Sequence, residues 1–287
     1  MLRRFEYTQA RSVEEALALW QGSPDSRYLA GGTDLIPRAR ATGRAPARLV
    51  DVKAVPELDQ VRALPDGGLS IGAAASVARV ATAPEVRQRF PVLATCCQAL
   101  GSYPLRQRAT VAGNICNASP CADTAAALLD LDAVVVASGP RGVRRVSIHE
   151  LFVGPGQTSL ERGELVTAIE LPAASAGARG QLGRLTRRQG VDIATVAVLV
   201  TVLPAGSLRH RVALLSVSPT PMRVAEAENL LDQKGPDGAA EAAAIARAAC
   251  RPIDDVRGSA SYRRDMVGVL LERAVHALAA ERGGRGA

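Results

Sequence analysis

Two short segments rich in glycine and small polar residues constrain this chain more than any other feature. The first is Tyr28-Leu-Ala-Gly-Gly-Thr-Asp-Leu35, and the second is Thr110-Val-Ala-Gly-Asn114 with its continuation to Asp123. Glycine leaves the backbone uncovered, so amide groups in such segments can approach another molecule closely. A fold for this chain therefore has to place both segments where the backbone can contact a ligand.

The first segment has the composition of a phosphate-binding turn. Residues 28–30 are typical of the end of a buried strand, and Gly31 and Gly32 remove the side chains where the chain turns. Thr33 or Asp34 is expected to cap the apolar stretch that begins at Leu35, which gives a helix or turn N-terminus with a partial positive charge. Free amides and this charge suit a phosphate group. An ordinary tight turn explains the same residues, so both alternatives stay open here.

The second segment offers polar groups with almost no bulk. Gly113 and Asn114 can adopt left-handed backbone conformations, and short hydrogen-bonding side chains come from Thr110, Asn117 and Ser119. We expect a flat polar ligand to lie against this surface.

Asp123 follows the second segment directly after Pro120-Cys-Ala. It is placed to cap an apolar run from Ala125 to Leu131, and its carboxylate could also receive a ribose hydroxyl. The two roles are compatible, and the sequence does not choose between them.

Composition indicates a globular protein with ample core. At 287 residues the chain should bury roughly three quarters of the surface exposed when unfolded, and 47% of its residues are hydrophobic. No apolar run approaches the roughly twenty residues that span a bilayer, and Met1-Leu-Arg-Arg-Phe-Glu leads into a polar segment rather than a signal peptide. We expect a cytoplasmic protein.

The charged and metal-binding residues exclude several functions. The net charge is +7, but Lys53 and Lys234 are the only lysines, and aromatic residues make up 3% of the chain, so nucleic acid is a poor ligand. The many arginines either solvate the surface or meet carboxylates on a protein partner. Five cysteines without a paired pattern indicate reduced thiols, and the three histidines form no cluster with zinc spacing.

The order of the predicted elements indicates an α+β fold in successive parts. We expect a small α/β unit at 1–55, a larger unit at 56–173, an α+β domain at 178–280 and a disordered tail at 281–287. Ser12-Val-Glu-Glu15 is a capping box that opens the first helix. The last helix is expected to pack through Met266, Val269, Leu270, Arg273 and Ala277. Predicted strands are 28–30, 49–52, 69–73, 133–137, 143–148, 165–171, 182–187, 194–203 and 211–217, and further helices begin at Ser76 or cover 92–100, 225–231 and 239–249.

Three stretches together resemble a known family. They are Ala30-Gly-Gly-Thr-Asp-Leu35, Thr110-Val-Ala-Gly-Asn-Ile-Cys-Asn-Ala-Ser-Pro-Cys-Ala-Asp123, and Arg257-Gly-Ser-Ala-Ser-Tyr-Arg-Arg264. In order and spacing the chain resembles the FAD-binding medium subunit of the molybdenum hydroxylases, which include xanthine dehydrogenase and aerobic carbon monoxide dehydrogenase. Weaker matches at 163–172 and 187–194 extend the resemblance over nearly the whole chain.

The resemblance implies a p-cresol methylhydroxylase-like FAD-binding domain with two lobes, 1–55 and 56–173, followed by the α+β C-terminal domain of the flavoprotein subunit. FAD would lie between the lobes and be noncovalent, because His149, His210 and His276 lie outside both glycine segments. The implied cofactor-binding residues are Leu29, Ala30, Gly31, Gly32, Thr33, Asp34 and Leu35 at the pyrophosphate, Thr110, Val111, Ala112, Gly113 and Asn114 at the flavin and ribityl chain, Asp123 at polar cofactor atoms, and Leu100, Val166 and Arg184 near the ring system.

This chain departs from the family pattern at two positions. Ala112 replaces the first glycine of Thr-Val-Gly-Gly-Asn and adds a methyl group, and Ile193 stands where some relatives have an aromatic residue beside the flavin. These changes put the flavin's reactivity toward acceptors in doubt. The pair Cys116 and Cys121 invites an iron–sulfur interpretation, but a cluster site needs four thiolates and the relatives with an extra cluster use an inserted loop that this chain lacks.

The implied function is electron transfer within a complex. A molybdopterin-binding large subunit and a small subunit with two [2Fe-2S] clusters would be the partners, in a dimer of heterotrimers, with NAD, quinone or oxygen as the final acceptor. No catalytic residue or metal ligand is assigned in this chain, because the redox chemistry belongs to the flavin. The alternatives are a free-standing flavin oxidoreductase of the same superfamily and a non-catalytic flavin-binding structural subunit.

Overall fold

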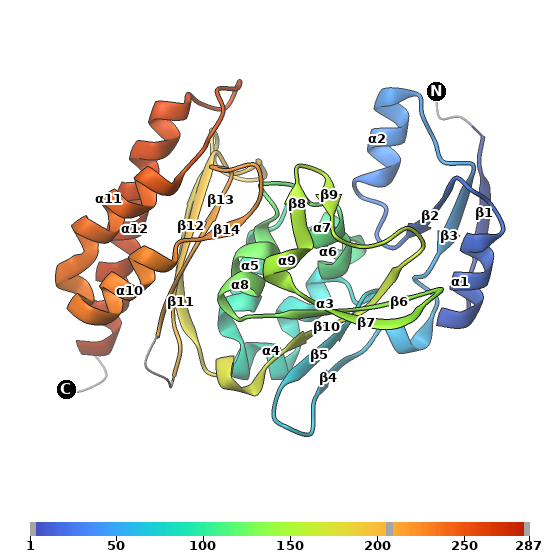
Figure 1. The fold of residues 1–287 in the computed structure, drawn as a ribbon, viewed down its shortest axis with the longest axis horizontal. Helices are drawn as coiled ribbons and strands as arrows, with labels where there is room; N and C mark the ends of the chain where they lie inside the picture. Colours follow the sequence, from blue (N-terminus) through green and yellow to red (C-terminus); the bar gives the residue numbers. More distant parts are fainter. Residues whose placement is uncertain (1–3, 205–208, 284–287) are drawn as a thin grey trace.

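A small parallel sheet forms the N-terminal part of the protein (Figure 1). The computed structural model describes residues 4–204 and 209–283. The sheet has the order β1-β3-β2. Because β2 and β3 run parallel, the chain crosses over through α2, and the Gly-Gly segment falls at the carboxyl end of β2. The elements are β1 (Glu6–Gln9), α1 (Val13–Gln21), β2 (Ser26–Leu29), α2 (Leu35–Thr42) and β3 (Arg48–Asp51).

The capping box at the start of α1 is present as predicted from the sequence. The hydroxyl of Ser12 accepts a hydrogen bond from the Glu15 amide at 3.1 Å. The Glu15 carboxylate in turn accepts from the amide of Arg11, the residue before the N-cap. The first bond satisfies one of the donors that the first turn of a helix leaves open, and the second holds the chain just before the helix.

An antiparallel five-stranded sheet forms the second part, in the order β4-β5-β10-β6-β7. Its strands are β4 (Val61–Ala63), β5 (Leu69–Gly72), β6 (Val134–Gly139), β7 (Gly142–Ser147) and β10 (Leu165–Leu171). A run of short helices connects β5 to β6 and carries the second glycine segment. The remaining elements are η1 (Pro56–Leu58), α3 (Val77–Thr82), α4 (Pro84–Arg89), α5 (Pro91–Ala99), α6 (Tyr103–Arg108), α7 (Val111–Cys116), α8 (Asp123–Asp130), α9 (Ile148–Leu151), β8 (Phe152–Gly154) and β9 (Gln157–Thr158).

The C-terminal part is a four-stranded antiparallel sheet between two helical layers (Figure 1). Helices α5 and α8 pack on one face and α10 and α12 on the other. The central strand β12 is buried along its whole length, as expected for a strand covered on both faces. Successive residues of β12 point to opposite faces of the sheet and so belong to different hydrophobic cores. Val198 packs in the core shared with the C-terminal helices, and Leu199 packs in the core that includes α5 and α8. The elements are η2 (Ala173–Ser175), β11 (Arg179–Leu185), β12 (Val196–Val202), β13 (His210–Leu215), β14 (Met222–Arg223), α10 (Ala225–Lys234), η3 (Gly235–Gly238), α11 (Ala239–Ala249) and α12 (Ala260–Gly283).

Two local predictions from the sequence are wrong. Gly113 and Asn114 are not left-handed, because they lie inside helix α7; Ala118, just after this helix, has the positive φ, of 47°. Asp123 does not cap α8. It is the first residue of that helix, Ala122 occupies the cap position, and the Asp123 carboxylate bonds to Arg184 instead.

The predicted face of the last helix is only partly confirmed. Met266 and Leu270 are half-buried and pack against the core, whereas Arg273 and Ala277 are exposed. The face that packs into the core is rotated by about one position and consists of Arg263, Val267, Leu271, Ala274, Val275 and Leu278. Helix α12 continues to Gly283, so the first three residues of the expected tail are helical, and 284–287 lie outside the described residues.

Candidate cofactor site

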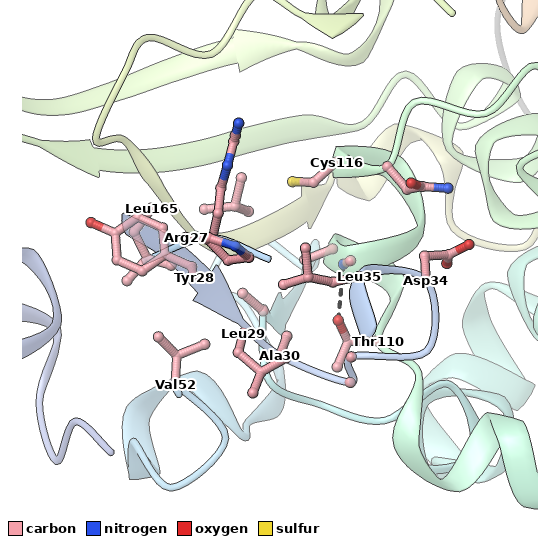
Figure 2. Close-up of a pocket in the computed structure, with 18 of the residues that line it drawn as sticks. Arg27, Tyr28, Leu29, Ala30, Asp34, Leu35, Val52, Thr110, Cys116 and Leu165 are labelled. Atoms are coloured by element: carbon pink, nitrogen blue, oxygen red, sulfur yellow. Dashed lines mark hydrogen bonds between the residues drawn. The ribbon is translucent and has the colours of Figure 1, made fainter. Parts of the chain in front are cut away.

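Both glycine segments line one large cavity of about 1060 Å³ between the first and second sheets. This volume is slightly above the usual range for ligand-binding cavities, roughly 300–1,000 Å³. Figure 2 shows side chains from β2, the loop after it and helix α7 around the cavity. Of the predicted cofactor-binding residues, those on its wall are Leu29, Ala30, Gly31, Gly32, Thr33, Asp34, Leu35, Leu100, Thr110, Ala112, Gly113, Asn114 and Val166.

The two positions of the first loop, 31 and 32, require glycine for different structural reasons. A β-carbon on Gly31 would lie 2.4 Å from the carbonyl oxygen of Arg108, so this position touches the backbone that leads into the second segment. Gly32 has a φ of 71°, in the left-handed region that side chains disfavour. The first glycine thus joins the two segments, and the second shapes the turn.

The first loop presents free backbone donors. In residues 4–204 and 209–283, the amides of Gly31, Gly32, Thr33 and Asp34 donate to no acceptor in the protein. Asp34 is the residue before α2, but its side chain forms no cap hydrogen bond. Because unpaired amides are costly when a site is desolvated, this cluster is suited to an anionic ligand.

The second segment is more rigid than the sequence suggested. The hydroxyl of Thr110 accepts from the Gly113 amide at 2.9 Å and begins α7, as the dashed line in Figure 2 shows. The side-chain amide oxygen of Asn114 accepts from the Thr124 hydroxyl at 2.6 Å, which ties α7 to α8. Val111 is buried and does not line the cavity.

Asp123 and Arg184 lie outside the wall of this cavity and bind each other. The guanidinium of Arg184 donates from Nε to the Asp123 carboxylate at 3.0 Å and from Nη2 to the Asp192 carbonyl at 2.5 Å. Burial raises the pKa of Asp123, and the charge of Arg184 opposes that rise. The pair joins α8 to β11, so it connects the second part of the chain to the third.

The sequence analysis missed an aromatic corner on the cavity wall, formed by Trp20 and Tyr28. The rings of Trp20 and Tyr28 stack with centroids 6.2 Å apart, and the guanidinium of Arg162 lies 5.7 Å from the Trp20 ring. The Tyr28 hydroxyl donates to the Gly163 carbonyl at 3.0 Å, and burial raises the pKa of Tyr28, which keeps this donor protonated. The only sequence signal was the weak family match that begins at Gly163.

The residues present fit a dinucleotide such as FAD. The cavity offers free amides at one segment, a rigid helix at the other, and an aromatic corner beside β2. The positions of the three histidines are consistent with a noncovalent cofactor: His149 bonds to Asp132, His210 bonds to Asp232, and His276 is exposed.

Comparison with known proteins identifies this arrangement. Residues 3–174 match the FAD binding domain in molybdopterin dehydrogenase, and residues 184–278 match the CO dehydrogenase flavoprotein C-terminal domain. The chain belongs to the FAD-binding medium subunits of the molybdenum hydroxylases. It is therefore a subunit of an FAD-dependent oxidoreductase, with the FAD-binding domain followed by the C-terminal domain, as the sequence motifs predicted.

Relatives match along the whole chain. The carbon monoxide dehydrogenase medium chain of Hydrogenophaga pseudoflava is 34% identical over 280 residues, which cover 96% of each chain. The glyceraldehyde dehydrogenase medium chain of Sulfolobus acidocaldarius is 31% identical and covers 94% of this chain and 96% of its own. Among solved structures, carbon monoxide dehydrogenase from H. pseudoflava aligns with a TM-score of 0.91 at 33% identity over 98% of this chain and 99% of its own. Quinoline 2-oxidoreductase from Pseudomonas putida 86 aligns at 0.89 and 27% identity over 99% of each chain.

Residues 4–204 and 209–283 contain no group of three or more histidine, cysteine or acidic residues arranged to hold a metal ion. Cys116 lies on the cavity wall and Cys121 is half-buried, and neither forms a disulfide. Within the same ranges, no helix is both long and apolar enough to cross a membrane.

Proposed function

We propose that this medium subunit is the part of a three-subunit molybdenum hydroxylase that passes electrons to the final acceptor. The observation that carries the proposal is the cavity shared by both glycine segments, with unpaired amides from Gly31 to Asp34 on its wall. Bound FAD would accept electrons from an iron–sulfur cluster of a partner and pass them to a final acceptor. The partners would be a molybdopterin-binding large subunit and a small subunit with two [2Fe-2S] clusters.

The roles of the chain's own residues follow from the geometry. Residues 29–35 would hold the pyrophosphate through backbone donors, since the four free amides need an anionic acceptor. Residues 110–114 would form a flat wall beside the flavin and ribityl chain, with Leu100 and Val166 as apolar contacts. The regions 1–55 and 56–173 would be the two lobes that exclude water from the cofactor.

Three predicted site residues take an indirect role in this proposal. Val111 is buried, so it would hold α7 in place through core packing and would not contact the cofactor. The Asp123–Arg184 pair is only slightly exposed, with 14% and 16% of the side chains accessible, and it would reach polar cofactor atoms only at the junction with the C-terminal part. The pair would then position the ring system relative to β11.

We propose the turn between β11 and β12 as part of the surface that meets a partner. Its Val191 and Ile193 are about half exposed, and Arg187 and Arg188 lie on the same turn. Exposed apolar and arginine side chains together are typical of protein interfaces. We further propose that the subunit works in the cytoplasm in a dimer of heterotrimers, with NAD, quinone or oxygen as acceptor.

The purified chain tests this proposal directly. It should bind FAD reversibly, prefer FAD to FMN, and release all flavin on acid precipitation. It should show no oxidation of purines, aldehydes or carbon monoxide with a dye acceptor, because those substrates would bind a different subunit. Flavin that stays on the denatured polypeptide would contradict noncovalent binding, and robust turnover by the single chain would establish a free-standing oxidoreductase instead.

A further inference from the structure

Several arginines face the cavity without an acidic partner. Arg27, Arg38 and Arg44 line it, and within residues 4–204 and 209–283 none of them has a carboxylate within ion-pair distance. Arg162 differs, because it donates to the Pro24 carbonyl and lies over Trp20. Acidic residues also line the cavity (Asp25, Asp34, Glu161 and Glu164), but in the described part of the chain none of them forms an ion pair with Arg27, Arg38 or Arg44.

Arg38 has the geometry to use its charge at the first loop. It lies one turn after Asp34 in α2, and its amide donates to the Asp34 carbonyl at 3.0 Å. Side chains on a helix lean toward its N-terminus, so a residue at the position of Arg38 can reach the turn that contains the free amides.

Arg38 also bridges the two walls of the cavity. Its Nη2 donates to the side-chain oxygen of Asn117 at 2.6 Å. Asn117 ends helix α7, which Thr110 begins, so this bond joins the helix of the first segment to the helix of the second. An amide oxygen orients the guanidinium but leaves its charge intact, and most of its five N–H donors remain available.

We propose that Arg38 is a further cofactor-binding residue that recognises the diphosphate group of the dinucleotide. Asn117 positions it, and the free amides of the first loop bind the same group from the other side. This inference rests on the proposed FAD function. It implies that Arg38 selects ligands that carry a diphosphate, such as FAD and ADP, and contributes nothing to riboflavin.

The test compares two arginines of the same helix. Arg40 is exposed like Arg38 but does not line the cavity, so Arg40→Gln is the matched control for Arg38→Gln. The full chain, stripped of flavin, is titrated with FAD, ADP and riboflavin by calorimetry at two salt concentrations. Circular dichroism and the unfolding midpoint confirm that both variants are folded.

Arg38→Gln should weaken FAD and ADP about tenfold, which corresponds to about 1.4 kcal/mol, and leave riboflavin unchanged. It should also reduce the salt dependence of FAD binding, because an ionic contact is lost. Asn117→Ala should give a smaller loss of the same pattern. Equal FAD affinity in Arg38→Gln and Arg40→Gln, or an equal loss for riboflavin, would overturn this inference alone. A wild-type chain that binds ADP but not FAD would overturn the proposed function instead.

Discussion

The contact between the two glycine segments can be broken by one methyl group. In Gly31→Ala the new β-carbon would lie 2.4 Å from the Arg108 carbonyl oxygen and 2.7 Å from the Ala109 α-carbon. Both neighbours are backbone atoms, so no side-chain rotation can relieve the contact. The first loop and residues 108–109 must separate by at least 0.6 Å, from 2.4 Å to the 3.0 Å below which β-carbons are not found.

The expected loss has two parts. Overpacking of this kind costs about 1–3 kcal/mol of unfolding free energy. A shift of the loop also misplaces the amides of residues 31–34, and a hydrogen bond to a charged group contributes about 1.5–3 kcal/mol. We therefore expect Gly31→Ala to lose about 2 kcal/mol of stability and to weaken FAD binding by about tenfold or more.

Gly43→Ala is the matched control. Gly43 has a φ of 64° at the end of α2, and nothing lies within 4 Å of a β-carbon placed there. The change therefore adds only backbone strain, about 1–2 kcal/mol, and it does so at the opposite end of α2 from the Gly31 contact. FAD affinity should stay at the wild-type value.

Urea unfolding of the flavin-free chain gives the two stabilities, and titration followed by flavin fluorescence gives the two FAD dissociation constants. The reasoning is refuted if Gly31→Ala and Gly43→Ala bind FAD with equal affinity, since backbone strain alone would then account for any loss that the two variants share.

Two further predictions concern buried charged groups. Burial raises the pKa of Asp130 well above its ordinary value of 3.8, so the folded protein favours the neutral acid more than the unfolded chain does, and the contribution of this group to stability falls as pH rises above 3.8. Asp130→Asn, which keeps an oxygen for the Thr201 hydroxyl, should stabilise the protein at pH 7 and gain less at pH 4; urea unfolding that gives the same gain at both pH values would contradict this. Arg263 is 2% exposed and donates to the carbonyls of Thr195 and Ser216 and to Asp255, so Arg263→Met should cost about 3 kcal/mol by removing the side-chain donor of both carbonyls and one of the two arginines that Asp255 pairs with. Arg264 is exposed, so Arg264→Met should cost little free energy of unfolding. Equal losses of stability in the two variants would show that the buried hydrogen bonds of Arg263 do not stabilise the protein.

Features set by neighbouring residues could be predicted from the sequence. The capping box at Ser12 and the buried run that became β12 depend on side chains close in the chain, and both are present. The turn at Gly31-Gly32 was expected for the same reason, since few residues other than glycine allow it.

Features that depend on contacts between residues far apart in the sequence could not be predicted. Gly113 and Asn114 have weak helix propensity, but Val111, Ala112 and Ile115 of the same segment are buried, and this packing stabilises α7 regardless. Asp123 was interpreted as a cap because its partner Arg184 is far away in the sequence. In α12 the pattern was misread because that helix contacts both α11 and the sheet, so half-buried residues such as Met266 lie beside the true core face, which includes the buried Arg263.

The first glycine segment also shows why a turn and a binding site could not be distinguished from sequence. Gly31 is required by the contact with residue 108 and Gly32 by its positive φ, so both would be glycine in a loop that binds nothing. What separates the two interpretations is the fate of the amides. In a turn that served only the fold, these donors would bond to nearby carbonyls. Here the four amides from Gly31 to Asp34 have no acceptor within the part of the chain that the structure describes, and they lie on the wall of a cavity that arginines also line. The structural role of the glycines therefore creates the binding surface, because the close contact at Gly31 fixes the loop while its donors remain free for an anion.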